Sequence, residues 1–292
     1  MTTPAIAIFG EVLFDRFDDG VEVLGGAPFN VAWHLQAFQQ PPLFISRIGQ
    51  DQAGGKIRRA MQSWGMSQTA LQTDSQQPTG AVEITLKNGE PEYQILANQA
   101  YDFIDAHSLP QFDCSLFYHG SLAARQPVSQ QALQQLVNQN QGKVFIDINL
   151  RQPWWNKTLV NKLLTKANWV KLNLQELQQL QADGDSLETK MRLFIQNYQL
   201  EVLVVTLGEQ GAWAIQQEGE LLKVKPDSHQ LVIDTVGAGD AFASVLLLGI
   251  LETWPLAISL QRAQQFASAL VGQRGAIVCD LNFYQPFKAA WL

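Results

Sequence analysis

Short apolar runs alternate with helix-period segments along most of the chain, and this alternation restricts the fold more than any other feature. Six runs rich in Ile, Val and Phe have the length and composition of buried strands. They are Ala5–Phe9, Leu43–Ile48, Ser115–Tyr118, Lys143–Ile148, Trp169–Leu172 and Glu201–Thr206. Helix-period segments between them include Asn30–Phe38, Lys56–Trp64, Ser129–Asn138, Leu187–Tyr198 and Gln261–Val271. We therefore expect an α/β chain of right-handed βαβ units, with helices on both faces of a mostly parallel sheet.

Two stretches interrupt this alternation. Val12–Glu22 and Thr79–Gln94 are predicted to form β hairpins or strands with polar interruptions, the second turning at Asn88-Gly89. A small β element attached to a large α/β layer is either a lid over a cleft or a surface extension with no moving role. The expected lid segments are residues 11–24 and 78–97.

Composition indicates a globular chain and disfavours nucleic acid as a partner. Apolar residues make up 46% and charged residues 16% of the 292 residues, and no internal repeat or linker-like tract is present. We expect residues 1–292 to form a single domain. The formal net charge is −7, and the 20 Lys and Arg are scattered without the cluster that a nucleic-acid interface needs.

The chain is expected to be cytoplasmic. Its two cysteines, Cys114 and Cys279, do not make a disulfide framework in a chain of this length, which favours a reducing compartment. The N-terminus has no cationic start and no long apolar stretch, so no signal peptide is expected. The longest apolar run, near Ala241–Leu251, is too short and interrupted to cross a bilayer, so no membrane association is expected.

The run of small residues at Asp234–Asp240 is the most informative segment. We expect a short strand at Val232–Asp234, then a tight turn, then a helix that continues to about Ile250. Glycines let a ligand approach the backbone closely. Unpaired N–H groups at the positive end of a helix dipole would form an anion hole for a transferring phosphoryl group. The N–H groups concerned are those of Ala238, Gly239 and Asp240, and the glycines are Gly237 and Gly239.

Asp240 has two interpretations from the residues alone. Asp favours helix N-termini, so it is suited to a capping role. A carboxylate beside an anion hole is equally suited to accept the proton of an alcohol that attacks phosphorus. That second role does not require a raised pKa.

The motif at Asp234–Asp240 resembles the D-T-x-G-A-G-D signature of the ribokinase-like (PfkB-type) carbohydrate kinase family, and Gly25–Ala32 resembles the family's second signature. The resemblance extends over the full length of the chain. It implies a three-layer α/β/α sandwich with a small β-sheet lid, and an ATP-dependent phosphotransferase that acts on a sugar hydroxyl. Gly49–Gly54 resembles the family's G-x-D-x-x-G turn; it is not a phosphate-binding P-loop, because Lys56 is followed by Ile57.

Further segments resemble those with which the family binds the nucleotide. Lys171–Glu176 contains an N-x-x-E motif, which as an isolated string would indicate no more than a helix start. Val205–Gly211 resembles the strand and turn beside the nucleotide. The implied nucleotide-binding residues are Asn173, Glu176, Thr206, Gly208, Gly211, Gly239 and Gln264. Many relatives have Asn where Gln264 aligns, which leaves the choice between ATP and GTP open.

The resemblance also implies roles for the remaining site residues. Asp240 would be the catalytic base, Gly237, Ala238 and Gly239 the anion hole, and Arg151 of the Asp147–Arg151 segment a phosphate clamp; an ordinary surface salt bridge is the alternative for Arg151. The implied sugar-binding residues are Asp15, Gly25, Gly26, Asn30 and Asp240. Implied metals are Mg²⁺, held through Glu176 indirectly, and K⁺, held by Asp234, Val236 and Gly275.

The identity of the sugar is the least constrained expectation. Gly25–Asn30, Gly120–Arg125 and Asp147–Arg151 resemble fructokinases more than ribokinases, so phosphorylation of D-fructose to fructose 6-phosphate is the first choice. The alternatives are 2-keto-3-deoxygluconate, ribose or a nucleoside, and a relative that binds sugar without turnover. Pairing of two lids in a homodimer, with Phe14, Phe17 and Tyr93 covering the substrate or packing on a partner, is a further expectation from the resemblance.

Overall fold

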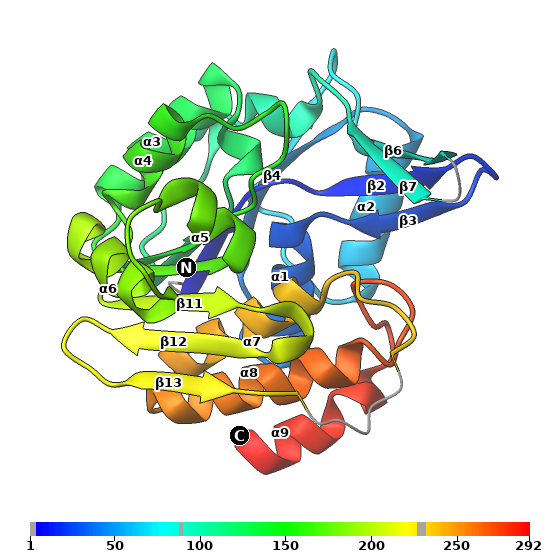
Figure 1. Ribbon diagram of the computed structural model, residues 1–292. Helices are drawn as coiled ribbons and strands as arrows, with labels where there is room; N and C mark the ends of the chain where they lie inside the picture. The colour runs from blue at the N-terminus through cyan, green and yellow to red at the C-terminus, as the bar shows by residue number, and fades with distance from the viewer. Residues whose placement is uncertain (1–3, 88–89, 227–231) are drawn as a thin grey trace.

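The computed structural model describes residues 4–87, 90–226 and 232–292 (Figure 1). Its larger sheet has nine strands in the order β13-β12-β11-β10-β9-β8-β1-β4-β5. All neighbouring strands from β11 to β5 pair in parallel, whereas β12 pairs antiparallel with both β11 and β13. The strands are β1 (Ile6–Phe9), β4 (Leu43–Gly49), β5 (Leu71–Asp74), β8 (Leu116–His119), β9 (Lys143–Asp147), β10 (Trp169–Asn173), β11 (Val202–Thr206), β12 (Ala212–Gln216) and β13 (Leu221–Val224). The expected mostly parallel sheet is confirmed.

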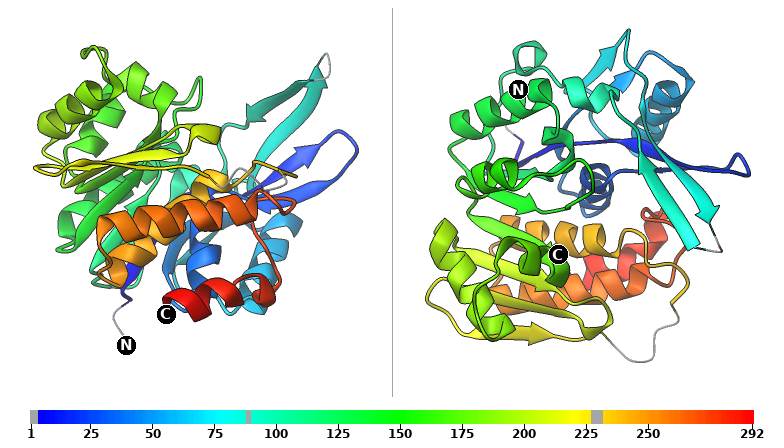
Figure 2. Two further views of the ribbon diagram at one scale, coloured as in Figure 1. Left: turned by 60° about the horizontal axis from the view of Figure 1, so that its bottom comes forward. Right: turned by 45° about the horizontal axis from the view of Figure 1, so that its top comes forward.

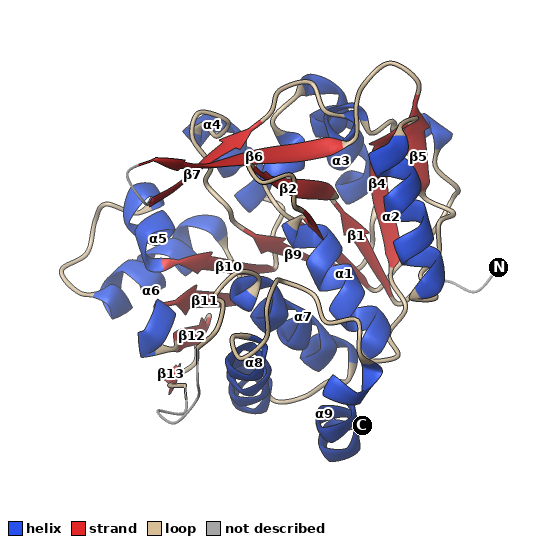
Figure 3. Ribbon diagram, turned by 90° about the vertical axis from the view of Figure 1, so that its right-hand side faces the viewer, coloured by secondary structure: helices blue, strands red, loops and turns tan. Residues whose placement is uncertain are grey.

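Helices cover both faces of this sheet (Figure 3). The α-helices are α1 (Ala27–Ala37), α2 (Gln52–Ser63), α3 (Pro127–Gln139), α4 (Lys157–Leu164), α5 (Leu174–Leu180), α6 (Leu187–Tyr198), α7 (Ala238–Leu251), α8 (Leu256–Leu270) and α9 (Gln285–Trp291). Short 3₁₀ turns lie at Ala100–Phe103, Ala106–Ser108, Leu122–Ala124, Gly208–Gln210 and Leu281–Phe283.

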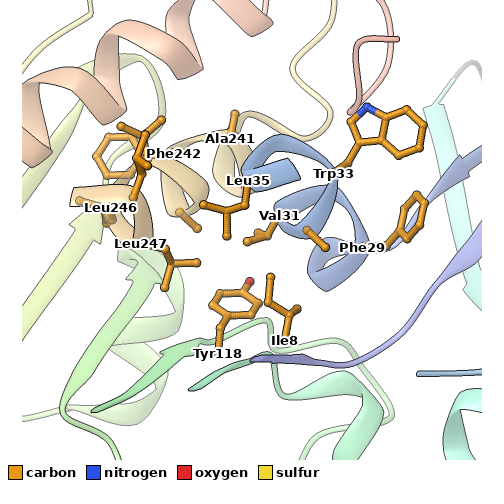
Figure 4. Close-up of a cluster of buried hydrophobic side chains, with 14 of the residues drawn as sticks. Ile8, Phe29, Val31, Trp33, Leu35, Tyr118, Ala241, Phe242, Leu246 and Leu247 are labelled. Atoms are coloured by element: carbon orange, nitrogen blue, oxygen red, sulfur yellow. The ribbon is translucent and has the colours of Figure 1, made fainter. Parts of the chain in front are cut away.

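Two hydrophobic cores lie on opposite faces of the sheet, because alternate residues of a strand point to opposite sides. In β1, Ile6 and Ile8 pack with α1, α7 and α8, whereas Ala7 and Phe9 pack with α3 and α4. Figure 4 shows the first core, where Ile8 and Tyr118 from the sheet face Leu35 and Leu247 from the helices. This three-layer arrangement confirms the expected α/β/α class.

A smaller sheet of four strands, in the order β3-β2-β6-β7, projects from one end of the main sheet (Figure 2, left). Its strands are β2 (Leu13–Phe17), β3 (Glu22–Gly25), β6 (Gly80–Lys87) and β7 (Glu90–Ile95). Two antiparallel hairpins, β2–β3 and β6–β7, are joined by a parallel β2–β6 pairing. Both predicted segments therefore form hairpins, but the first continues to Gly25, beyond the predicted end at Glu22. The turn predicted at Asn88-Gly89 lies outside the described residues.

The G-x-D-x-x-G turn connects this sheet to the main body. Asp51 caps α2 by accepting the Gly54 N–H at 2.7 Å, and it also accepts the Thr79 N–H and hydroxyl at 2.8 and 2.6 Å. The pKa of Asp51 is lowered: burial opposes the shift, but the hydrogen bonds from Thr79 and Gly54 outweigh it. Since Thr79 immediately precedes β6, one carboxylate fixes both the start of a core helix and the root of a hairpin.

The prediction of a short strand at Val232–Asp234 is wrong. These residues form no strand; the N–H groups of Ile233 and Asp234 instead donate to the carbonyl of Val271, at 2.7 and 3.1 Å. Val232 and Ile233 are 61% and 54% exposed. Their apolar side chains lie on the surface, so these two apolar residues do not belong to a buried strand.

The long apolar run near Ala241–Leu251 is a core helix. It forms most of α7, whose residues Ala241–Gly249 are all buried, and α7 packs against α1 and α8. Within the part of the chain that the structure describes, none of the helices combines the length and apolar character needed to cross a bilayer.

Candidate active site

The turn before α7 has a backbone that requires glycine. Gly237 is the N-cap residue of α7 and has φ of 78°, in the left-handed region. A Cβ at this position would lie 2.4 Å from the Cβ of Ala276. A larger residue would therefore be strained and would also displace the neighbouring segment.

The first turn of α7 supplies fewer free N–H groups than the sequence predicted. The N–H of Ala238 donates to the carbonyl of Thr235 at 3.3 Å. Those of Gly239 and Asp240 meet no backbone carbonyl among the described residues. They remain at the positive end of the helix dipole, which is where an anion is stabilised.

Asp240 is not the capping residue of α7. It is the third residue of the helix, and its Oδ2 accepts a 2.7 Å hydrogen bond from Nδ2 of Asn30 on α1. Burial raises the pKa of Asp240 to about 7, and the Asp147 carboxylate adds to that rise; the bond from Asn30 and the cations Lys171 and Arg151 oppose it. A pKa near neutrality suits a general base.

The residues predicted to bind the sugar converge next to Asp240. A Cβ placed on Gly25 would lie 3.8 Å from Oδ1 of Asn30 and 3.9 Å from Oδ2 of Asp15. Gly26 has φ of 109°, and a Cβ there would lie 2.7 Å from the carbonyl oxygen of Glu11. Oδ1 of Asn30 is buried and has no hydrogen-bond partner. Carboxylate and amide groups therefore surround a glycine corner, an arrangement that fits a polyhydroxyl ligand.

Arg151 is exposed and lies close enough to influence both carboxylates of this site. Burial raises the pKa of Asp15 to about 6, and Arg151 opposes that rise, as it does for Asp240. Its position after β9 places it at the carboxyl edge of the sheet, where ligands bind in α/β folds.

The N-x-x-E motif forms a capping box at the start of α5. Oδ1 of Asn173 accepts the N–H of Glu176 at 2.9 Å, and Oε2 of Glu176 accepts the N–H of Asn173 at 2.8 Å. Oε1 of Glu176 accepts the N–H of Leu150 at 3.0 Å. Burial raises the pKa of Glu176, and these bonds oppose the rise. Both carboxylate oxygens thus hold backbone groups, including the N–H of the residue before Arg151, which is consistent with the predicted indirect contact with Mg²⁺.

The other residues predicted on the nucleotide side come from two places. Thr206, Gly208 and Gly211 lie on one connection, from the end of β11 to the start of β12. Gly211 has φ of 90°, and a Cβ there would lie 2.0 Å from the carbonyl oxygen of Val224. Gln264 lies on α8, which packs against β12 and β13, and its amide donates to the Ser268 hydroxyl at 3.0 Å.

The structure brings together the three residues predicted to bind K⁺. Asp234 accepts the N–H of Val236 at 3.0 Å through Oδ1 and the N–H of Gly275 at 2.9 Å through Oδ2. Among residues 4–87, 90–226 and 232–292 there is no group of three or more His, Cys, Asp and Glu placed to hold a metal. A cation here would therefore depend on backbone carbonyl oxygens beside one carboxylate, which suits a weakly held monovalent ion.

Two buried charged residues next to Asp240 were not among the site residues predicted from the sequence. Glu11 is 3% exposed, and its Oε2 has no hydrogen-bond partner. Burial raises the pKa of Glu11 to about 7, and Asp240 contributes to that rise. Lys171 is 6% exposed in the middle of β10. Each had a visible signal: a carboxylate two residues after a buried strand, and a lysine inside an apolar run.

Fold and site together define an enzyme that transfers phosphoryl groups, and comparison with known proteins agrees. The family model described as pfkB family carbohydrate kinase matches residues 7–282. The chain belongs to the PfkB family of carbohydrate kinases.

Curated relatives cover most of the chain. It is 29% identical over 259 residues to a fructokinase from Salmonella typhimurium, covering 83% of each protein. It is 28% identical over 269 residues to an aminoimidazole riboside kinase from Salmonella typhimurium strain LT2, covering 87% of this chain and 83% of the relative.

Solved structures agree in fold. A fructokinase from Vibrio cholerae O395, in a form bound to fructose, ADP and calcium, has a TM-score of 0.83 at 24% identity, covering 96% of this chain and 97% of its own. An aminoimidazole riboside kinase from Salmonella enterica, complexed with aminoimidazole riboside and an ATP analog, has a TM-score of 0.84 at 22% identity, covering 97% and 99%.

Proposed function

We propose that this protein transfers the γ-phosphoryl group of ATP to the primary hydroxyl of D-fructose, giving fructose 6-phosphate. The observation that carries the proposal is the position of Asp240. Its carboxylate lies in the first turn of α7, directly after the glycine turn, and is held by Asn30 from the sugar side. A base and an anion hole are thus adjacent, which phosphoryl transfer to an alcohol requires.

The mechanism follows from this geometry. Asn30 occupies Oδ2 of Asp240, which leaves Oδ1 to accept the proton of the sugar hydroxyl. The hydroxyl oxygen forms a bond to the γ-phosphorus as the bond from that phosphorus to the β–γ bridging oxygen breaks, and ADP leaves with the electron pair. The N–H groups of Gly239 and Asp240 stabilise charge on the phosphoryl oxygens. Arg151, which lies close enough to influence Asp240, would clamp the phosphate.

The nucleotide and its metals would be held by the residues on the other side of the turn. ATP would lie along the connection containing Thr206, Gly208 and Gly211, with Gln264 near the adenine ring. Mg²⁺, when bound, would neutralise phosphate charge, with Asn173 and Glu176 orienting the surrounding backbone. Asp234, Val236 and Gly275 would hold K⁺ beside the anion hole and fix the turn that contains Gly237.

We propose that the chain functions as one kinase domain in which the smaller sheet is a lid. Asp15 on β2 and Gly25 at the end of β3 connect this sheet to the sugar site. Phe14 is buried, whereas Phe17 and Tyr93 are 40% and 57% exposed. The two exposed aromatic rings are available to a second lid, so a homodimer is part of the proposal.

Fructose is the first choice of acceptor because curated relatives named fructokinase match most of the chain. The similarity to an aminoimidazole riboside kinase keeps a riboside as the second candidate. Ribose, 2-keto-3-deoxygluconate and binding without turnover remain outcomes of the same test.

The test is an ADP-release assay with Mg·ATP and K⁺ over fructose, ribose, 2-keto-3-deoxygluconate, adenosine, aminoimidazole riboside and fructose 6-phosphate. We expect ADP release only with an acceptor present, and fastest with fructose. Asp240→Asn should lower kcat at least about 10²-fold, the low end for general-base catalysis. A faster rate with another acceptor would overturn fructose alone, and near-normal turnover by Asp240→Asn would overturn the mechanism.

A further inference from the structure

A buried ammonium group lies against the anion-hole turn. Lys171 on β10 is 6% exposed. Its Nζ would lie 3.6 Å from a Cβ placed on Gly239, which is ordinary van der Waals contact. The same lysine influences the pKa of Asp240. The cation is therefore a neighbour both of the residues that would contact the phosphoryl group and of the base.

The ammonium is fixed in place by one carboxylate. Nζ of Lys171 donates to Oδ1 and Oδ2 of Asp147, at the end of β9, at 2.8 and 2.9 Å. The two side chains are 7% and 8% exposed. Burial lowers the pKa of Lys171, but Asp147, Asp240 and Glu176 more than reverse that effect, so the pKa is raised overall and the group stays charged.

A gain in folding stability does not readily explain the buried Lys171–Asp147 ion pair. Removing two charges from water costs several kcal/mol per ion, and well-packed apolar replacements of buried ion pairs are often neutral or stabilising. Val204, which pairs with Lys171 in the adjacent strand β11, is fully buried in the core that also contains α7, so this face of the sheet accommodates apolar side chains readily. The location of the charge at the phosphoryl site therefore needs a different explanation.

The charges around the turn supply that explanation. Asp147, Asp240 and Glu176 all lie close enough to influence Lys171, and each of these carboxylates would repel an incoming phosphate. Arg151 is exposed and attached to a loop, so its charge is screened by solvent. Of the two cations that influence Asp240, Lys171 is buried and held by an ion pair, whereas Arg151 is exposed. A fixed charge in a low-dielectric site stabilises developing charge most effectively.

We propose that Lys171 stabilises the transition state of phosphoryl transfer, because its ammonium supplies a fixed positive charge against the anion-hole turn. The inference rests on the proposed kinase function. Asp147 holds the ammonium in place and does not itself act on the phosphoryl group. The contribution is to the chemical step, so kcat should change far more than the KM for sugar.

Three variants separate this role from a structural one. Lys171→Met removes the cation, Asp147→Asn removes the ion pair but keeps the cation, and the double variant Lys171→Met/Asp147→Asn replaces the pair by uncharged groups of similar size. Thermal unfolding confirms that each variant is folded. We expect kcat to fall about 10²-fold in both variants that lack Lys171, as on loss of one oxyanion-hole donor. The KM for sugar should stay within about threefold of that of the parent protein, and Asp147→Asn should retain much more activity.

A binding measurement tests the same proposal without turnover. ADP with aluminium fluoride mimics the transferring group, and calorimetry measures its affinity in each variant. Affinity should fall in both variants that lack Lys171, whereas affinity for ADP alone should change little. The double variant lacks the cation but also lacks the unpaired buried carboxylate that Lys171→Met leaves behind. Recovery of kcat or of this affinity in the double variant would therefore show that Lys171 has only a structural role, and would overturn the proposal. If the parent protein releases no ADP with any acceptor, the proposed function fails, and the aluminium fluoride measurement alone decides the role of Lys171.

Discussion

Nδ2 of Asn30 donates a 2.7 Å hydrogen bond to Oδ2 of Asp240, across 210 positions of the sequence. Asn30 lies in the first turn of α1 and Asp240 in the first turn of α7, and these helices pack against each other on the same face of the sheet. The orientation of the proposed base is therefore set by packing between the two ends of the chain. The same asparagine also faces Gly25, which belongs to the proposed sugar site.

Replacing Asn30 by Ala should lower activity and shift its pH dependence. The hydrogen bond from Asn30 lowers the pKa of Asp240, which stands at about 7 in the intact site. A base acts when deprotonated, so kcat/KM of the parent protein should rise as pH increases through about 7. Without the donor the carboxylate is less stabilised, so this limb should move to higher pH, with at least about a 10-fold loss at pH 6. Rates measured from pH 5.5 to 9 test this, and an unmoved limb would contradict it.

The central strands were predictable because they are buried on both faces. Phe44 and Ile45, adjacent in β4, are both fully buried, so such strands are continuous apolar runs. The edge strands lack this signal: β13 is only partly covered, and β12 ends in an exposed Gln216. Periodicity therefore gave the centre of the sheet and missed the edge strands.

Site residues that belong to a sequence motif were predictable, whereas site residues that reach the site only through packing were not. Gly237 and Asp240 belong to one short motif, and the structure places them at one helix start. The effect of Lys171 depends on contact between β10 and the first turn of α7, and that of Glu11 on its burial close enough to Asp240 for the two charges to interact. No spacing in the sequence encodes such contacts.

Glu11→Gln should stabilise the protein above neutral pH. Burial raises the pKa of Glu11 from an ordinary value of 4.5 to about 7. A carboxyl with a raised pKa contributes stability that is complete below its unfolded pKa and is lost as pH rises through the folded one. The parent protein should therefore lose on the order of 2–3 kcal/mol between about pH 4.5 and 7 from this group. Gln titrates no proton, so the unfolding free energy of the variant should be flatter over that range.

Chemical denaturation at half-unit pH intervals measures this difference. Glu83→Gln, an exposed position on β6, serves as the control for removal of a negative charge. Parallel pH profiles for the parent protein and Glu11→Gln would show that Glu11 does not titrate in this range.

Gly237→Ala should abolish most activity, whereas Gly20→Ala should not. Both glycines have left-handed backbones, with φ of 78° and 84°, so both variants carry backbone strain of about 1–2 kcal/mol. They differ in space, because a Cβ on Gly237 would lie 2.4 Å from that of Ala276, whereas one on Gly20 meets nothing within 4 Å. We expect similar small losses of stability from strain, but a kcat loss of about 10²-fold or more only for Gly237→Ala. Melting temperatures and kcat for both variants decide between displacement of the anion hole and strain alone.

Asp234 connects the two segments of the proposed K⁺ site, so its removal should uncouple activity from K⁺. The carboxylate accepts N–H groups of Val236 and Gly275, at 3.0 and 2.9 Å, and Ala276, next to Gly275, packs against Gly237. A bound cation would hold this arrangement and so the shape of the anion hole. Replacing K⁺ by tetraethylammonium should lower kcat at least about 10-fold in the parent protein, as expected when preorganised donors are displaced. Asp234→Ala should be slow in both salts, whereas Asp280→Ala, also on the surface, should keep the full K⁺ response. Equal rates of the parent protein in the two salts would remove K⁺ from the mechanism.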